Sequence, residues 1–118
     1  FPPSWSRREM TTSSVIKMTE GVWFVYLLLC ARGAIYTGVT PHVAQRMRLH
    51  RDGKGAKFTR MNKPLRLLAA KPYSDKRTAM QVEAQVKRMP ADGKRFLAQE
   101  WSKQYPIDEA AQELLAVE

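Results

Sequence analysis

The sequence is poor in the residues that form cross-links and metal centres. It contains one cysteine, Cys30, so no disulfide can form within the chain and no cysteine cluster can bind zinc. Its two histidines, His42 and His50, are too few for most histidine-based metal sites, so a catalytic metal would have to be bound by carboxylates. The longest apolar run, residues 22–31, has about half the length of a membrane span and is typical of a buried strand. We therefore expect no membrane partner.

Acidic residues are also scarce. The chain has 20 Lys and Arg but only 11 Asp and Glu, which gives a net charge of +9. Residues 42–88 carry thirteen of the basic and three of the acidic side chains, a local charge of +10, whereas residues 89–118 carry −3. We expect the middle of the chain to face a polyanion such as nucleic acid, with the acidic C-terminal helices pointing away. The alternative is a basic face that is merely solvated.

Hydrophobic spacing predicts one α+β domain with helices packed on a small sheet. At 118 residues, 44% of them hydrophobic, the chain has room for a single core. The pattern gives the order β-β-α-β-α-α-α. The expected strands are residues 22–30, 34–39 and 65–70, and the expected helices begin at Thr40-Pro41, Ser74-Asp75, Pro90 and Pro106.

The last two helices are expected to contribute apolar faces. The helix over residues 90–101 should bury Phe96, Leu97 and Trp101, and the helix over 106–117 should present Ile107, Ala110, Leu114 and Leu115 on one side.

We divide the chain into a mobile arm (1–20), the domain (21–102) and a helical extension (103–118). No basic-then-apolar leader is visible, so we expect a cytoplasmic protein.

Five polar residues interrupt this pattern in a way that packing does not explain. Tyr26 and Tyr36 lie in the first two strands, where a hairpin can bring both rings to one face. Arg46 and His50 are four residues apart and share a helix face, and Glu83 interrupts the apolar stripe of the next helix. Such a group suits phosphodiester hydrolysis, because Glu can hold a divalent cation, Arg can stabilise phosphate charge and a phenol or imidazole can move a proton.

Each of these residues also has a purely structural interpretation. The tyrosines could be ordinary strand aromatics with their hydroxyls at the sheet edge, and Arg46 could be an unpaired surface cation. His50 could interact with the dipole at the end of its helix. Glu83 could form an ion pair with Lys87, four residues further on.

A glycine-punctuated basic loop follows the first helix. The loop over residues 53–60 lacks the Lys-Ser/Thr pair of a Walker loop, so its cations are expected to contact the DNA backbone. The predicted DNA-binding residues are Arg48, Lys54, Lys57, Arg60 and Lys63. Solvated loop charge is the alternative.

Five elements in this order resemble the core of the GIY-YIG nucleases, in particular the small bacterial stand-alone members. The elements are Val25-Tyr26-Leu27, Tyr36-Thr37-Gly38, Arg46 with His50, Gly53-Lys54-Gly55-Ala56-Lys57, and Glu83-Ala84 with Lys87-Arg88. The similarity covers about residues 22–101. It implies a three-stranded antiparallel sheet flanked by helices and a single-metal nuclease domain. The first triplet departs from Gly-Ile-Tyr, Val39 replaces a basic residue found in some members, and no Asn follows Glu83.

The resemblance also implies roles for the candidate site residues. Glu83 would bind one Mg²⁺ or Mn²⁺ ion, and Arg46 would contact the scissile phosphate. Tyr26 and Tyr36 would line the site, and the general base stays open between these two phenols and His50. No small-molecule cofactor beyond the metal is expected.

The function that follows is a divalent-metal-dependent DNA endonuclease. We expect it to be directed by DNA structure rather than sequence, to act in DNA repair or recombination, and to be associated with the nucleoid; RNA is not excluded as a substrate. One alternative is a non-catalytic nucleic-acid-binding module on the same fold. Another is a scaffold whose acidic C-terminal helices dock a partner protein through Leu114 and Leu115.

Overall fold

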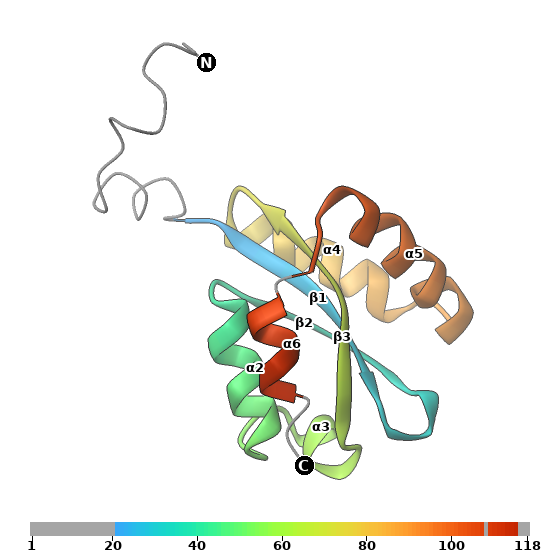
Figure 1. Cartoon of the computed structure of the whole chain (residues 1–118). Coiled ribbons are helices and arrows are strands. Elements are labelled where there is room, and N and C mark those ends of the chain that lie inside the picture. Colours follow the sequence, from blue (N-terminus) through green and yellow to red (C-terminus); the bar gives the residue numbers. More distant parts are fainter. Residues whose placement is uncertain (1–20, 108, 116–118) are drawn as a thin grey trace.

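A computed structural model describes residues 21–107 and 109–115, so the arm expected over residues 1–20 lies outside the described part (Figure 1). The elements are β1 (Trp23–Cys30), a 3₁₀ turn (Ala31–Gly33), β2 (Ile35–Thr40), α2 (Val43–Arg51), α3 (Lys57–Met61), β3 (Pro64–Tyr73), α4 (Lys76–Lys87), α5 (Ala91–Gln104) and α6 (Glu109–Leu115). The α+β fold expected from the sequence is confirmed. None of the helices within the described ranges is long and apolar enough to cross a bilayer.

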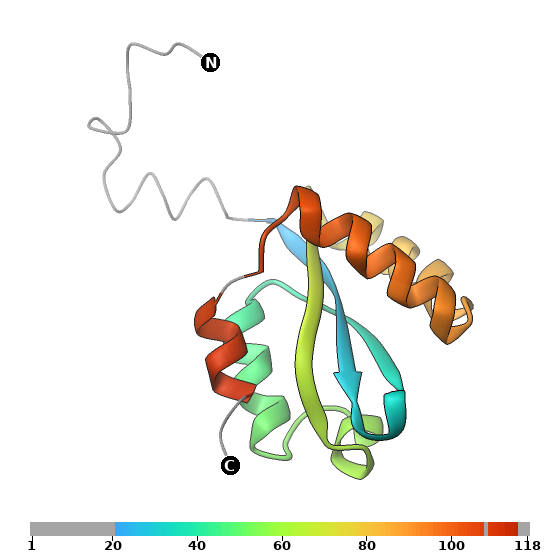
Figure 2. The same ribbon diagram turned by 45° about the vertical axis from the view of Figure 1, so that its right-hand side comes forward.

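The three strands form an antiparallel sheet in the order β2-β1-β3, with β1 in the middle. The central position of β1 explains why its sequence is almost continuously apolar, since both of its faces are covered. Helices α2 and α6 lie on one side of the sheet, and α4 and α5 lie on the other (Figure 2). We call these sides the α2/α6 face and the α4/α5 face.

Alternate residues of the strands supply a separate hydrophobic cluster to each face. The buried members on the α4/α5 face are Val25, Leu27, Ile35, Ala69, Ala79, Val86, Ala98 and Trp101. Those on the α2/α6 face are Tyr26, Leu28, Cys30, Met47, Leu67, Ala111 and Leu115. Cys30 is fully buried, as expected of a small hydrophobic residue, and burial raises the pKa of its thiol to about 11.

Helix α6 is joined to the sheet by side-chain as well as apolar contacts. The side-chain amide of Gln112 accepts a hydrogen bond from the backbone N–H of Leu67 and donates one to its carbonyl, so it pairs with the free edge of β3. Leu115 is buried in the α2/α6 cluster. The expectation that Leu115 anchors a partner protein is therefore wrong, because its side chain is used by the core; the side chains of Ala110 and Leu114 lie outside the described part.

Two details of the helices differ from the sequence prediction. Helix α2 starts at Val43 rather than at Pro41, because Thr40 is still the last residue of β2 and its hydroxyl accepts a hydrogen bond from the His42 N–H. Phe96 was expected in the core but is 64% exposed, while Leu97 and Trp101 pack inward. Phe96 and Trp101 are five residues apart, about 140° around the helix axis, so they cannot both face the sheet.

The basic loop also differs, because residues 57–61 form the short helix α3. One helical turn is too short to produce a recognisable hydrophobic period, so the spacing of apolar residues did not indicate it. The third strand is longer than expected, Pro64–Tyr73 rather than residues 65–70.

Candidate active site

The β1–β2 hairpin brings the two tyrosines together. Its register sets Tyr26 opposite Gly38 and Leu28 opposite Tyr36, so both phenols lie on the α2/α6 face with ring centroids 6.1 Å apart. A Cβ on Gly38 would lie 2.5 Å from the Tyr26 hydroxyl oxygen. Gly38 is therefore needed to leave space for the phenol of its cross-strand neighbour.

A chain of hydrogen bonds links Tyr26 to the loop after α2. The Tyr26 hydroxyl lies 2.8 Å from His50 Nε2, and His50 Nδ1 lies 2.9 Å from Thr59 Oγ1. The Thr59 hydroxyl in turn donates to the carbonyl oxygen of Ala56 at 2.9 Å. All three side chains of this chain, Tyr26, His50 and Thr59, are at most 2% exposed.

The bond to Ala56 determines the direction of the other two. A threonine hydroxyl has one proton, and here the carbonyl oxygen of Ala56 takes it, so Thr59 Oγ1 must accept from His50 Nδ1–H. In a neutral imidazole the other nitrogen then carries the lone pair. The Tyr26 hydroxyl consequently donates to His50 Nε2.

Burial keeps both groups of the Tyr26–His50 pair neutral. Burial, and to a lesser extent the nearby Arg46 charge, lower the pKa of His50 to about 4. Burial and the neighbouring Tyr36 phenol raise the pKa of Tyr26 well above its ordinary value, although Arg46 acts in the opposite sense. The Tyr26 hydroxyl is therefore buried and hydrogen-bonded rather than placed at the sheet edge, and His50, in the last turn of α2, is neutral.

Arg46 and Glu83 approach the pair from different helices. Arg46 lies one turn before His50 on α2, and its charge influences both His50 and Tyr26. Glu83 lies on α4, which also packs against β2, and its carboxylate is close enough to raise the pKa of Tyr26. Tyr26, Tyr36 and His50 are thus in mutual contact on the α2/α6 face, with Arg46 one turn from His50 on the same helix. Glu83 comes from α4, on the other side of the sheet, and its charge acts on Tyr26.

The Glu83 carboxylate offers one strong ligand for a hard cation. Its side chain is 16% exposed and forms the expected ion pair with Lys87, with Oε2 and Nζ 3.4 Å apart. Among the described residues no group of three or more metal-binding side chains occurs. Mg²⁺ commonly binds through one or two carboxylates together with water and substrate phosphates, so a single carboxylate fits such an ion. The Lys87 partner is about half exposed, and exposed pairs of this kind are weak.

Besides Thr59, α3 and the loop before it add two residues to the site that the sequence did not predict. Phe58 stacks on Tyr36, with ring centroids 5.9 Å apart and planes 24° apart, and is itself 40% exposed. Gly55 lies against the His50 ring, where a Cβ would collide with Nδ1. The second glycine of Gly53-Lys54-Gly55 was the available signal for such a close approach.

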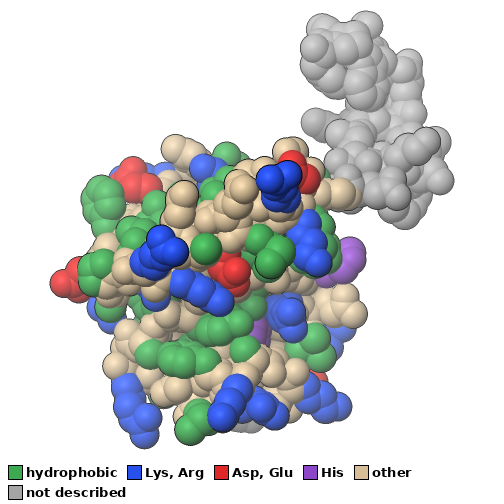
Figure 3. All heavy atoms as spheres, turned by 180° about the vertical axis from the view of Figure 1, so that it is seen from behind, with side chains coloured by type: hydrophobic (Ala, Val, Ile, Leu, Met, Phe, Trp, Pro, Cys, Tyr) green, Lys and Arg blue, Asp and Glu red, His purple; other side chains and the backbone are tan. Residues whose placement is uncertain are grey.

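The predicted DNA-binding residues are all exposed. Arg48, Lys54, Lys57, Arg60 and Lys63 all face solvent, and none forms an ion pair with another described residue. Arg48 leaves α2 about 200° around the axis from Arg46, so it projects away from the tyrosines. On the side of the molecule opposite to that seen in Figure 1, Lys and Arg side chains are spread among hydrophobic ones (Figure 3).

Comparison with known proteins gives the family of this domain. Residues 22–95 match the family model of the GIY-YIG catalytic domain. The chain belongs to the GIY-YIG family. This match covers more than half of the 118 residues and includes every residue of the candidate site. The GIY-YIG family is part of a nuclease superfamily, which is what the resemblance of the sequence had indicated.

The relatives of this GIY-YIG protein are small. A UPF0213 protein of Cupriavidus pinatubonensis is 49% identical over 70 residues, 59% of this chain and 78% of the relative. A UPF0213 protein of Neisseria gonorrhoeae is 41% identical over 86 residues, 73% of this chain and 94% of the relative. The solution structure of a UPF0213 protein from Bacillus halodurans has 39% identity and a TM-score of 0.44, covering 72% of this chain and 88% of that one.

Proposed function

We propose that the protein is a divalent-metal-dependent endonuclease that hydrolyses phosphodiester bonds in DNA. The observation that carries the proposal is the hydrogen bond from buried, neutral Tyr26 to buried, neutral His50, beside one guanidinium and one carboxylate. We further propose that the enzyme is directed by DNA structure and serves repair or recombination. With DNA as its substrate, we expect it in the cytoplasm, associated with the nucleoid.

The Tyr26–His50 pair is suited to accept the proton of the attacking water. Water would give a proton to the Tyr26 oxygen while the phenolic proton moves to His50 Nε2, so the pair gains one proton in total. The hydroxide equivalent forms its bond to phosphorus, the bond to the leaving sugar oxygen breaks, and that oxygen takes a proton from solvent water. His50, whose pKa is about 4, then releases its extra proton to solvent, which restores the neutral pair. Tyr36, next to Tyr26, would line the path of the incoming water.

Arg46 and the cation held by Glu83 would stabilise the negative charge of the phosphate. The guanidinium of Arg46 would donate hydrogen bonds to the non-bridging phosphate oxygens, where charge develops. Glu83 would hold the cation, and Lys87 would move aside into solvent. When bound, Mg²⁺ or Mn²⁺ supplies Lewis-acid stabilisation of the phosphate. The exposed cations Lys54, Lys57, Arg60 and Lys63 would contact the DNA backbone on either side.

Nicking of supercoiled plasmid in Mg²⁺ tests this function. The parent should cleave, and Glu83→Gln and Arg46→Ala should each lower the rate at least about 100-fold, which is the usual scale for loss of one charge-stabilising group. Glu100→Gln is a matched control, because Glu100 also pairs with a lysine on its own helix but lies on α5. Equal cleavage by Glu83→Gln and the parent would contradict the assigned site.

The same experiment separates the non-catalytic alternative. A binding module would retain DNA in a salt-sensitive manner and would not cleave it, whichever divalent ion is supplied. Binding is expected to weaken with rising salt in either case, by about 0.9 log unit in affinity per log unit of salt for each phosphate neutralised. Only cleavage therefore decides between the two.

A further inference from the structure

The hydroxyl of Thr59 makes two buried contacts that nothing in the catalytic scheme above uses. Thr59 lies in α3, is 2% exposed and bonds to both Ala56 and His50. Within the described residues, neither Glu83, Arg46 nor either tyrosine forms a hydrogen bond with it. Its role must therefore be exerted through His50.

The imidazole of His50 has two neutral forms, and only one is useful in the Tyr26–His50 pair. With the proton on Nδ1, Nε2 can receive the phenolic proton of Tyr26. With the proton on Nε2, the ring would donate to the Tyr26 oxygen and could take nothing from it. The second nitrogen of the ring therefore decides whether Tyr26 can pass on a proton.

We propose that Thr59 is a positioning residue that holds His50 in the Nδ1–H form and so keeps Nε2 open toward Tyr26. This inference rests on the proposed function only for its catalytic consequence. The backbone contact to Ala56 makes Thr59 an acceptor toward His50, and the absence of a Cβ on Gly55 lets the loop approach the ring closely enough for the bond. Tyr36 and Arg46 also lie near the ring, but among the described residues the hydrogen bonds of the imidazole go to Tyr26 and Thr59, and Arg46 has no lone pair that could replace the hydroxyl.

Thr59→Val tests the proposal, because valine has nearly the same shape and lacks the hydroxyl. The buried Nδ1–H would lose its acceptor, which is costly, so the proton should move to Nε2. The ¹⁵N spectrum of His50, in which the protonated and bare nitrogens differ strongly, should show Nδ1–H in the parent and Nε2–H in Thr59→Val. Plasmid nicking by Thr59→Val should fall about 10- to 100-fold, whereas Thr59→Ser should keep the parent spectrum and stay within about 3-fold of the parent rate.

Thr37→Val provides a matched control. Thr37 is also 2% exposed, but its hydroxyl has no hydrogen-bond partner among the described residues. It pairs with Leu27 across the hairpin, so its side chain lies on the α4/α5 face. We expect its replacement to leave the spectrum of His50 and the cleavage rate unchanged.

The outcomes distinguish this proposal from the proposed function. An unchanged His50 spectrum in Thr59→Val would overturn the positioning role even if the protein is a nuclease. If the parent never cleaves DNA but Thr59→Val still moves the His50 proton to Nε2, the result would support the role of Thr59 and contradict the nuclease. Equal rates for Thr59→Val and Thr59→Ser in an active enzyme would also overturn the proposal. If Thr59→Val does not fold, the spectrum of Thr59→Ala decides in the same way.

Discussion

The two faces of the sheet are built by the same strands but differ in what they bury. The α4/α5 face is closed by eight buried residues, all hydrophobic, and the one buried hydroxyl beside it, that of Thr37, has no partner among the described residues. The α2/α6 face buries Tyr26, His50 and Thr59, and each of these makes a hydrogen bond. Buried polar groups cost free energy unless they are bonded, so the second face gives up apolar packing for a fixed arrangement of proton donors and acceptors.

The largest effect on stability should come from the α4/α5 face. Leu27 is fully buried in the middle of β1 on that side. Leu27→Ala should lower the free energy of unfolding by about 2–5 kcal/mol, because it removes apolar contacts and leaves a cavity. Urea denaturation measures this loss. The cleavage rate per folded molecule should stay near that of the parent, and a selective loss of activity at full stability would contradict the division of work between the faces.

The second effect is a dependence of stability on pH between about 4 and 6.5, which comes from His50 on the α2/α6 face. The pKa of His50 is about 4 in the folded protein and about 6.5 in the unfolded chain, so the unfolded state binds the extra proton between these values. The stability due to neutral His50 is therefore complete above pH 6.5 and is lost as the pH falls toward 4, by about 3 kcal/mol in total. His50→Gln should remove this slope from urea titrations. His42→Gln, at an exposed position, should retain it.

Substitutions at Gly55 and Gly53 should distinguish a steric collision with the His50 ring from the effect of a left-handed backbone conformation. Gly55→Ala would drive a Cβ into the His50 ring and should cost about 1–3 kcal/mol together with most of the cleavage activity. Gly53 has a φ of 73° and a Cβ there would meet no atom within 4 Å, so Gly53→Asn, which tolerates this conformation, is the control. Denaturation and nicking assays on both variants should show a loss for Gly55→Ala only.

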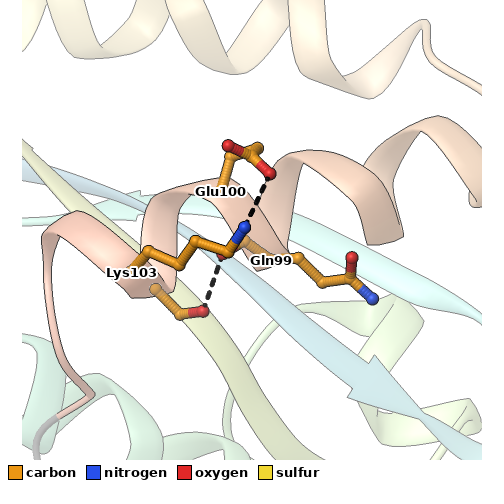
Figure 4. A network of polar contacts seen from close by, with 4 residues as sticks. Gln99, Glu100 and Lys103 are labelled. Atoms are coloured by element: carbon orange, nitrogen blue, oxygen red, sulfur yellow. Dashed lines mark hydrogen bonds and ion pairs between the residues drawn. The ribbon is translucent and has the colours of Figure 1, made fainter.

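The smallest effect is expected on the outer side of α5. Lys103 pairs with Glu100 at 3.3 Å, and both side chains are exposed (Figure 4). Such a pair contributes little, so Lys103→Ala should change the free energy of unfolding by less than about 0.5 kcal/mol. A loss above about 1 kcal/mol in urea denaturation would show that this surface takes part in stability beyond the pair itself.

Much of the fold was predictable, because strand order and core faces follow from regular patterns. The continuous apolar run of β1 and the spacing of Ala79 and Val86 on α4 are signals that extend over many residues. Phe96 was misplaced because helical position, rather than hydrophobicity, decides which side chain meets the sheet. The predicted start of α2 was wrong because the Thr40 hydroxyl accepts a hydrogen bond from the His42 N–H in a turn, and a threonine in such a turn looks like a helix N-cap in the sequence.

The candidate site was predictable only as a set of residue types. The order of Tyr26, Tyr36, Arg46, His50 and Glu83 resembled a family, and the structure brings the rings of Tyr26, Tyr36 and His50 into contact. The hydrogen-bond partners were not predictable, because the contact between Thr59 and His50 depends on a single helical turn and on the missing side chain of Gly55. Spacing along the chain carries no information about such a loop.

A crystal soaked in Mn²⁺ tests the central claim most directly. We predict one anomalous peak at the Glu83 carboxylate, on the side of Tyr26 and Arg46, and no peak there in Glu83→Gln. A peak that persists in Glu83→Gln, or manganese bound only at a distant position in the parent, would contradict the account.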